Sequence, residues 1–242
     1  VGMIFCETRN IGWQAPRNIW VKNALSEAVV AHTELIVMLF DWVFPMIVYL
    51  IQKHCKMPTH MAQQELIFML LRLLKCVLDF DDGCCSDMPK AIEGAFFFCL
   101  TWSIGSVVDG DGRIKFDKMI RQIMAGEIYS TPEYDDFAIK NPDYVADKER
   151  KCTIIPADEG VIFDYVFDVK TGRWMGWMEG HPTFKIERDA KFVNIVVPTI
   201  DTIRNEYVVE KLLLKGYHVM CTGDTGTGKT VCVRNKLLGG MP

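Results

Sequence analysis

A glycine-rich motif between residues 223 and 230 constrains the fold of this chain more than any other feature. It has the pattern G-x-x-x-x-G-K-T. The apolar residues 217–221 before it predict a short strand, and residues 231–238 after it predict the start of a helix. A strand, a glycine-rich loop and a helix in this order are typical of a phosphate-binding loop. The loop consists of Gly223, Asp224, Thr225, Gly226, Thr227, Gly228, Lys229 and Thr230.

Each part of this loop has a physical reason to bind phosphate. Its glycines have no Cβ atom, so they can adopt positive φ and let backbone N–H groups surround an anion. The following helix adds the positive end of its dipole. Lys229 would reach the β- and γ-phosphates, and the hydroxyl of Thr230 would bind Mg²⁺. We expect the Asp224 side chain to point to solvent, because a carboxylate facing phosphate would repel it.

Composition narrows the classes of partner. The net charge is −4 and no basic stripe is present, which argues against a nucleic-acid partner. Residues 35–51 form an apolar run, but this run contains Asp41 and Pro45, so we expect a buried helix and no membrane partner. The nine cysteines include no C-x-x-C pair, which favours free thiols in a reducing compartment. Neither the group His54, Cys55 and His60 nor the loop at 109–114 has the ligands of a metal site.

The first half of the chain predicts a helical region. Apolar residues recur at helical spacing in several segments, and one of them, at 95–102, is apolar almost throughout and implies central burial. The predicted helices are residues 16–30, 33–53 with a kink at Pro45, 61–78, 89–108 and 113–125.

The second half predicts strands and turns before the glycine-rich loop. Residues 126–156 are polar and rich in proline, which is typical of a linker. Residues 161–169 and 173–178 predict a β-hairpin, with Trp174 and Trp177 on the returning strand packing against a neighbouring surface. Further strands are expected at residues 2–7 and 191–197, and a helix at 201–215 that ends at Gly216.

Several segments resemble one family of proteins, the dynein heavy chains. Residues 197–207, followed by the loop at 223–230, are similar to the start of the third AAA+ module of these chains, and the Thr-Gly-Thr-Gly-Lys-Thr loop looks more like the axonemal than the cytoplasmic type. Residues 98–105 resemble part of the helical subdomain of the second module. Residues 163–165, with the two tryptophans of the hairpin, resemble the connector between the modules. The resemblance covers nearly the whole chain in collinear order.

The resemblance implies a fold and a division into parts. The expected fold class is α/β and helical, an AAA+ P-loop NTPase fragment with a helical small subdomain, a β-hairpin connector and the start of a P-loop α/β domain. Residues 1–12 would be the last strand of the preceding large subdomain, 13–125 the helical small subdomain, 126–190 the linker with the hairpin, and 191–242 the N-terminal part of the next large subdomain.

The resemblance also implies a function. The parent protein would be an ATP-driven microtubule motor, and this chain would contribute a regulatory nucleotide site that holds ATP or ADP with Mg²⁺. Val197, Pro198 and Thr199 would lie near the adenine. The implied partners are the other AAA+ modules, the microtubule, and dynein intermediate and light chains. The implied location is the cytoplasm or cytoskeleton, in the axoneme of a cilium or flagellum.

The sequence leaves three hypotheses open. Only residues 231–242 follow the loop, and a complete P-loop enzyme needs later strands for its Mg²⁺-binding acid and water-positioning groups. We therefore expect a motor fragment with no catalytic residue of its own. A non-catalytic structural or interaction fragment is the alternative, and an independent small P-loop NTPase or kinase is disfavoured because it would need roughly 100 more residues.

Overall fold

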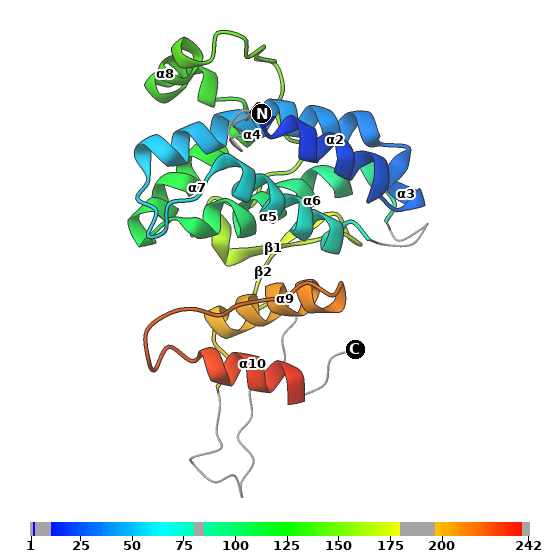
Figure 1. Ribbon diagram of the computed structural model, residues 1–242, viewed down its shortest axis with the longest axis vertical. Helices are drawn as coiled ribbons and strands as arrows, with labels where there is room; N and C mark the ends of the chain where they lie inside the picture. The colour runs from blue at the N-terminus through cyan, green and yellow to red at the C-terminus, as the bar shows by residue number, and fades with distance from the viewer. Residues whose placement is uncertain (1, 3–10, 80–84, 180–196, 239–242) are drawn as a thin grey trace, which may run out of the picture. The chain divides into compact units, whose positions relative to one another are not determined.

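The computed structural model describes residue 2 and residues 11–79, 85–179 and 197–238 (Figure 1). The chain divides into two compact units, unit 1 (Val1–Trp174) and unit 2 (Met175–Pro242). The predicted strand at 2–7, apart from Gly2, and residues 191–196 lie outside the described residues. The elements are α2 (Gln14–Asn23), α3 (Glu27–Val30), α4 (Thr33–His54), α5 (Gln63–Val77), α6 (Met88–Ser103), η1 (Gly105–Val107), α7 (Gly110–Ala125), η2 (Ile128–Ser130), α8 (Pro132–Lys140), η3 (Ile162–Asp164), β1 (Tyr165–Asp168), β2 (Arg173–Gly176), α9 (Ile200–Leu214) and α10 (Lys229–Leu238).

Helix α4 of unit 1 packs against α6, α7 and α8. It is long and apolar enough to cross a membrane by length and composition alone, with a mean hydropathy of 2.0, but 61% of that stretch is buried inside the protein. The Phe40 ring meets the Phe96 ring of α6 edge to face, with the centroids 5.1 Å apart. The helix continues through Pro45. Its packing is that of a core helix, as the sequence predicted.

The prediction of one continuous helix at residues 16–30 is wrong, because the structure has two helices there. Helix α2 ends at Asn23 and α3 begins at Glu27. Ser26 between them has an extended backbone with ψ 159°, and its hydroxyl donates to the Leu78 carbonyl at 3.4 Å. Serine side chains that bind backbone groups compete with helix formation in this way.

The N-terminal ends of α6 and α7 are capped by aspartate side chains. Asp87 accepts from the Lys90 N–H at 3.1 Å, and Asp109 accepts from the Gly112 N–H at 2.8 Å. Such caps satisfy N–H groups that have no partner within the helix. Helix α7 therefore starts three residues before the predicted residue 113, at Gly110. Helix α6 ends at Ser103, and residues 105–107 of the predicted helix form the 3₁₀ turn η1 instead.

The segment predicted to be a linker contains a helix. Helix α8 begins with Pro132 and is capped by the Thr131 hydroxyl, which accepts from the Tyr134 N–H at 3.3 Å. Proline is favoured at the first position of a helix, so the residue that suggested a loop is in fact a helix start. Tyr49 and Lys53 of α4 both donate to Asp136 and hold α8 on the core.

The predicted β-hairpin is present but shorter than expected. Strands β1 and β2 form a two-stranded sheet, and residues 162–164 form the 3₁₀ turn η3 before it. Strand β1 packs against α6 (Figure 1). Phe167 of β1 lies so close to Gly94 of α6 that a Cβ atom at Gly94 would be only 2.1 Å from its ring. This close approach requires glycine at position 94. Trp174 packs on Phe167 with the ring centroids 5.3 Å apart.

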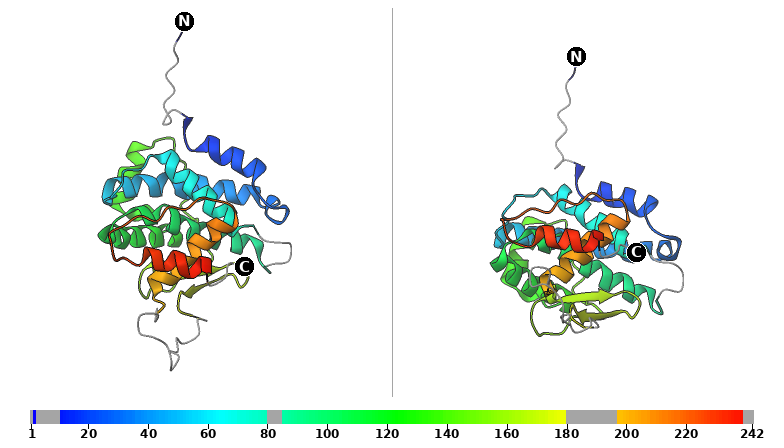
Figure 2. Two further views of the ribbon diagram at one scale, coloured as in Figure 1. Left: turned by 60° about the horizontal axis from the view of Figure 1, so that its bottom comes forward. Right: turned by 90° about the horizontal axis from the view of Figure 1, so that it is seen from below.

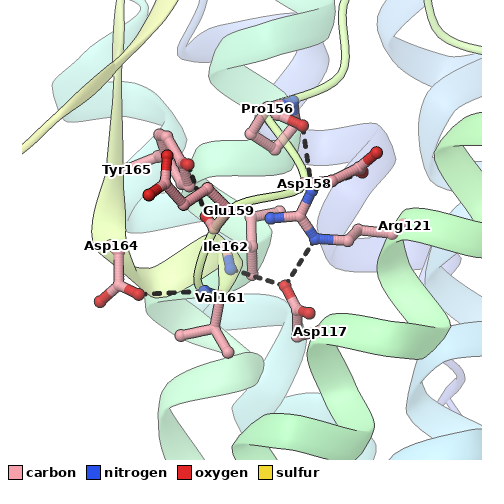
Figure 3. A network of polar contacts seen from close by, with 9 residues as sticks. All are labelled: Asp117, Arg121, Pro156, Asp158, Glu159, Val161, Ile162, Asp164 and Tyr165. Carbon is pink, nitrogen blue, oxygen red and sulfur yellow. Dashed lines mark hydrogen bonds and ion pairs between the residues drawn. The ribbon is translucent and has the colours of Figure 1, made fainter.

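A polar network attaches the chain before the hairpin to α7 (Figure 3). One carboxylate oxygen of Asp117 accepts from the Ile162 N–H at 2.6 Å and from Arg121 Nε at 2.9 Å. Arg121 Nη1 also donates to the Pro156 carbonyl at 2.9 Å. Both side chains are largely buried, with 14% exposure for Asp117 and 15% for Arg121. The hairpin is therefore fixed on the helical core of unit 1 by polar as well as aromatic contacts.

In unit 2 helices α9 and α10 lie side by side (Figure 2). Lys236 of α10 forms an ion pair with Glu210 of α9, and Trp177 packs on Tyr207 of α9 at 5.3 Å between centroids. The strand predicted at residues 217–221 is not present. A strand is held by hydrogen bonds to a neighbouring strand, and none lies beside these residues in the described part of unit 2. This prediction from apolar character alone was wrong.

Candidate phosphate-binding loop

The glycine-rich loop adopts the backbone conformation that its glycines allow. It follows residues 217–222, which form neither a helix nor a strand, and leads into α10, which begins at Lys229. Gly226 and Gly228 have φ angles of 84° and 79°, in the left-handed region that side chains with a Cβ atom avoid. Gly228 also accepts a hydrogen bond from the Cys232 N–H at 3.0 Å, which joins the loop to the first turn of α10.

Lys229 folds back over this loop. Its ammonium group donates to the Gly223 carbonyl at 2.8 Å and to the Asp224 carbonyl at 2.5 Å. It also donates to the hydroxyl of Thr227 at 2.9 Å. The Thr227 hydroxyl in turn donates to the Asp224 carbonyl at 2.9 Å. The structure thus brings together Gly223, Asp224, Thr227 and Lys229 of the predicted site.

The side chains of Asp224, Thr225 and Thr230 lie at the protein surface. Asp224 and Thr225 are exposed, and the contacts of Asp224 with Lys229 and Thr227 use its carbonyl oxygen. Thr230 lies in the first turn of α10 and is exposed. Its hydroxyl could supply one oxygen ligand to Mg²⁺, a cation that usually keeps several waters and is bound with phosphate oxygens. In the described part of the chain, no group of three His, Cys, Asp or Glu residues is placed to hold a metal ion.

The three residues predicted to lie near adenine are at the start of α9. Val197 and Pro198 are exposed, and the Val197 side chain is 55% exposed. Thr199 caps α9 through its hydroxyl, which accepts from the Thr202 N–H at 3.2 Å. The described hydrogen bonds of Thr199 go to Thr202 and Ile203 and not to the loop.

Charges between α9 and α10 shape the surroundings of the loop. Partial burial raises the pKa of Glu206, although nearby Lys236 lowers it. Partial burial also raises the pKa of the Cys232 thiol, and the carboxylate of Glu206 adds to that effect. The thiol of Cys232 is therefore a poor thiolate source at neutral pH.

Sequence reasoning missed the part played by Thr227. Its position is variable in the motif, so the pattern assigned it only a backbone contribution. The available signal was chemical: a hydroxyl two residues before the lysine can accept a hydrogen bond from an ammonium group.

Unit 1 holds a separate open cavity of about 730 Å³. It lies among α2, α4 and the chain after α8, and its lining includes Trp13, Asp41, Tyr49 and Tyr144. Because its lining residues belong to unit 1, this cavity is not part of the loop in unit 2.

Two family models match this chain and together cover most of it. Residues 36–179 match the dynein heavy chain AAA lid domain. Residues 184–242 match the P-loop containing dynein motor region, which includes the whole glycine-rich loop.

Curated relatives agree with these matches. The chain is 31% identical to dynein axonemal heavy chain 12 of Mus musculus over 98% of this chain and 8% of that protein. It is 26% identical to dynein axonemal heavy chain 3 of Homo sapiens over 98% of this chain and 6% of that protein. With dynein axonemal heavy chain 1 of Mus musculus the identity is 28%, over 100% of this chain and 6% of that protein. The chain thus spans less than a tenth of the length of these relatives.

The order of the two matched regions is also the order of the structure, in which a helical unit with a hairpin precedes a loop that leads into a helix. A P-loop region of this kind implies nucleotide binding, and the three relatives named above are axonemal dynein heavy chains. The chain therefore belongs to the dynein heavy chain family, as a helical-rich AAA+ segment that carries a lid and a P-loop.

Proposed function

We propose that this chain contributes the phosphate-binding loop of a regulatory nucleotide site in an axonemal dynein heavy chain. One observation carries the proposal. The left-handed backbone at Gly226 and Gly228 leads directly into α10, with Lys229 as its first residue, inside the region that matches the dynein P-loop model. Glycines before a helix N-terminus expose N–H groups to an anion and place the helix dipole behind it.

In this proposal residues 223–230 surround the phosphates of ATP or ADP. Lys229 contacts the β- and γ-phosphates, and the exposed Thr230 hydroxyl binds Mg²⁺. Val197, Pro198 and Thr199 contribute to the adenine end. Of these, Val197 and Pro198 have exposed side chains that a base could cover, whereas the Thr199 hydroxyl already serves as a helix cap.

The chain alone binds nucleotide without turning it over, in our proposal. The described contacts of Lys229 are with the loop itself, and they include no carboxylate that could complete a Mg²⁺ site or orient water. Turnover, movement on a microtubule and contacts with intermediate and light chains then belong to the whole heavy chain in the axoneme.

We also propose the division of the chain into modules. Residues 1–12 end the large subdomain of a second AAA+ module, and residues 13–125 form its helical small subdomain. Residues 126–190 connect the modules through the hairpin, and residues 191–242 open the third module. The hairpin contacts with α6 and α7 support a connector that is built on the helical subdomain.

Equilibrium binding of a fluorescent ATP analogue with Mg²⁺ tests this function. We expect weak but saturable binding that Lys229→Ala reduces by more than about tenfold, because removing a charged phosphate contact costs on the order of 1.4 kcal/mol or more. Arg234→Ala is the matched control, since it removes an exposed cation from the same helix outside the loop. Equal loss in both variants would mean that binding is general charge attraction.

A second function is favoured by a different observation. Unit 2 exposes large apolar side chains, with 85% exposure for Met220 and 54% for Leu237. Exposed apolar surface is typical of interaction sites. If the wild-type chain binds no nucleotide, a non-catalytic interaction fragment becomes the better description of its function.

A further inference from the structure

The three protons of the Lys229 ammonium group are all used within the loop. Their acceptors are the Gly223 carbonyl at 2.8 Å, the Asp224 carbonyl at 2.5 Å and the Thr227 hydroxyl at 2.9 Å. A lysine ammonium has three donors and no acceptor. In this arrangement Lys229 has no proton left for a phosphate, so a bound phosphate must displace at least one of the three acceptors.

Thr227 differs from the other two acceptors in one respect. Gly223 and Asp224 use backbone carbonyls, which every residue at those positions would provide, whereas Thr227 uses its side chain. The Thr227 hydroxyl is also held in place, because it donates its own proton to the Asp224 carbonyl at 2.9 Å. Its lone pairs are thereby oriented toward the ammonium group.

We propose that Thr227 is a positioning residue that holds Lys229 in a retracted position and thereby lowers the affinity of the loop for nucleotide. The proposal rests on the proposed function, because it concerns the same lysine and the same phosphates. When a nucleoside triphosphate binds, Lys229 exchanges the Thr227 hydroxyl for a phosphate oxygen. The affinity of the site is then set by the difference between these two hydrogen bonds and not by the phosphate contact alone.

The substitution that isolates this effect is Thr227→Val. Valine keeps the branched shape of threonine and removes the hydroxyl, so Lys229 loses one acceptor while the backbone keeps its form. Thr227→Ser restores the hydroxyl and should behave like the wild type. Thr222→Val is the matched control, because Thr222 is an exposed threonine just before the loop whose hydroxyl takes no part in the described contacts of Lys229.

Acetylation of lysines without nucleotide tests the retraction by itself. The full chain is treated with an acetylating ester, and mass spectrometry compares the rate at Lys229 with the rate at the exposed Lys170 in the same sample. Thr227→Val should raise the ratio at least about twofold, the lower end of what one net hydrogen bond contributes. An unchanged ratio would overturn the proposal.

Binding of the fluorescent ATP analogue tests the consequence for affinity. Thr227→Val should bind about two- to tenfold more tightly than the wild type, and Thr227→Ser and Thr222→Val should match the wild type. Weaker binding by Thr227→Val would identify the hydroxyl as a phosphate ligand and overturn the positioning role.

The two experiments separate this proposal from the proposed function. If no variant binds nucleotide while acetylation of Lys229 rises in Thr227→Val, the nucleotide site is overturned and the retraction of Lys229 is supported. If the wild type binds nucleotide and Lys229→Ala does not, but acetylation is the same in Thr227→Val, the nucleotide site stands and the role of Thr227 is overturned.

Discussion

Helices α6 and α9 have nearly the same length, 16 and 15 residues, but they differ in how much they bury. Residues 91–103 of α6 are all buried in unit 1, whereas α9 of unit 2 has no buried residue. Both begin with a cap, Asp87 in α6 and Thr199 in α9. Local signals are therefore enough to start a helix in either unit. Among the residues that the structure describes, however, only those of unit 1 surround a helix closely enough to exclude water from it.

This difference in burial means that the two units are stabilised in different ways. Unit 1 is stabilised by a core of its own, with several aromatic rings on α4, α6 and α7, among them Phe40, Phe97 and Phe116. Unit 2 is held by caps, the Lys236–Glu210 ion pair and the hydrogen bonds of Lys229 within the loop. The ion pair is half-buried, but α9 has no buried residue, so we expect the free energy of unfolding of the chain to depend mainly on unit 1.

The sharpest test of the comparison uses the same substitution in both units. Leu100→Ala removes a fully buried side chain from α6 and should lower the free energy of unfolding by about 2–5 kcal/mol. Leu214→Ala removes a leucine that is 44% exposed on α9 and should change it by less than about 0.5 kcal/mol. Urea unfolding followed by tryptophan fluorescence measures both. Similar losses in the two variants would show that unit 2 has a core after all.

We expect a smaller loss of stability when the polar network that attaches the hairpin to α7 is broken. Asp117→Ala leaves the Ile162 N–H and the Arg121 guanidinium without their shared acceptor and should cost about 2 kcal/mol. Hydrogen exchange at the Ile162 amide should become faster in the same variant. Asp158→Ala is the control, because Asp158 is fully exposed and meets Arg121 only at 3.7 Å. If the two variants behave alike, the hairpin is held by its aromatic contacts and not by this network.

The smallest expected effect on the free energy of unfolding comes from Glu93, a buried acid of unit 1. Burial raises the pKa of Glu93 above its ordinary value of 4.5, although the Thr153 N–H donates to its carboxylate at 2.7 Å. The folded chain therefore holds this proton more tightly than the unfolded chain, and the stability that it contributes is present below pH 4.5 and lost as pH rises through the raised pKa.

Glu93→Gln tests the sign of this dependence. Glutamine keeps an oxygen for the Thr153 N–H and removes the charge, so the variant should gain stability relative to the wild type as pH rises above 4.5. Urea unfolding at a series of pH values measures the difference between the two proteins. Glu149→Gln, at an exposed position, should show no such trend. If the wild type instead gained stability relative to the variant as pH rises, the raised pKa of Glu93 would be contradicted.

Periodicity and capping residues predicted the parts of the fold that local interactions determine. The long helix α4 was predicted to within one residue at its end, and the hairpin was placed by its turn at residues 171 and 172. Helix α8 was missed because Pro132, Thr131 and the acids around them are equally common in loops. Its contacts with α4, such as those of Asp136, come from the tertiary fold and are not visible in the local sequence. The strand at 217–221 was wrong because apolar character does not by itself supply a neighbouring strand.

The candidate site shows the same limit of local patterns. The motif predicted the glycines and Lys229, because a loop that surrounds phosphate needs glycines at these spacings. Gly226 and Gly228 have the positive φ angles that such a loop requires. The contact of Lys229 with Thr227 depends on the side-chain conformation of the lysine, which the spacing of the motif does not determine. The roles of Val197 and Pro198 at the adenine stay predictions.

Hydrogen exchange of the full chain with and without Mg²⁺ and ATP tests the central claim most directly. If the loop of unit 2 binds the phosphates, protection should appear in peptides that cover residues 223–230 and the first turn of α10. Peptides from α4 and α6 should not change, because the core of unit 1 is already closed to solvent. Lys229→Ala should abolish the protection. Exchange at residues 223–230 that is the same with and without nucleotide, at concentrations up to several millimolar, would contradict the assignment of this loop.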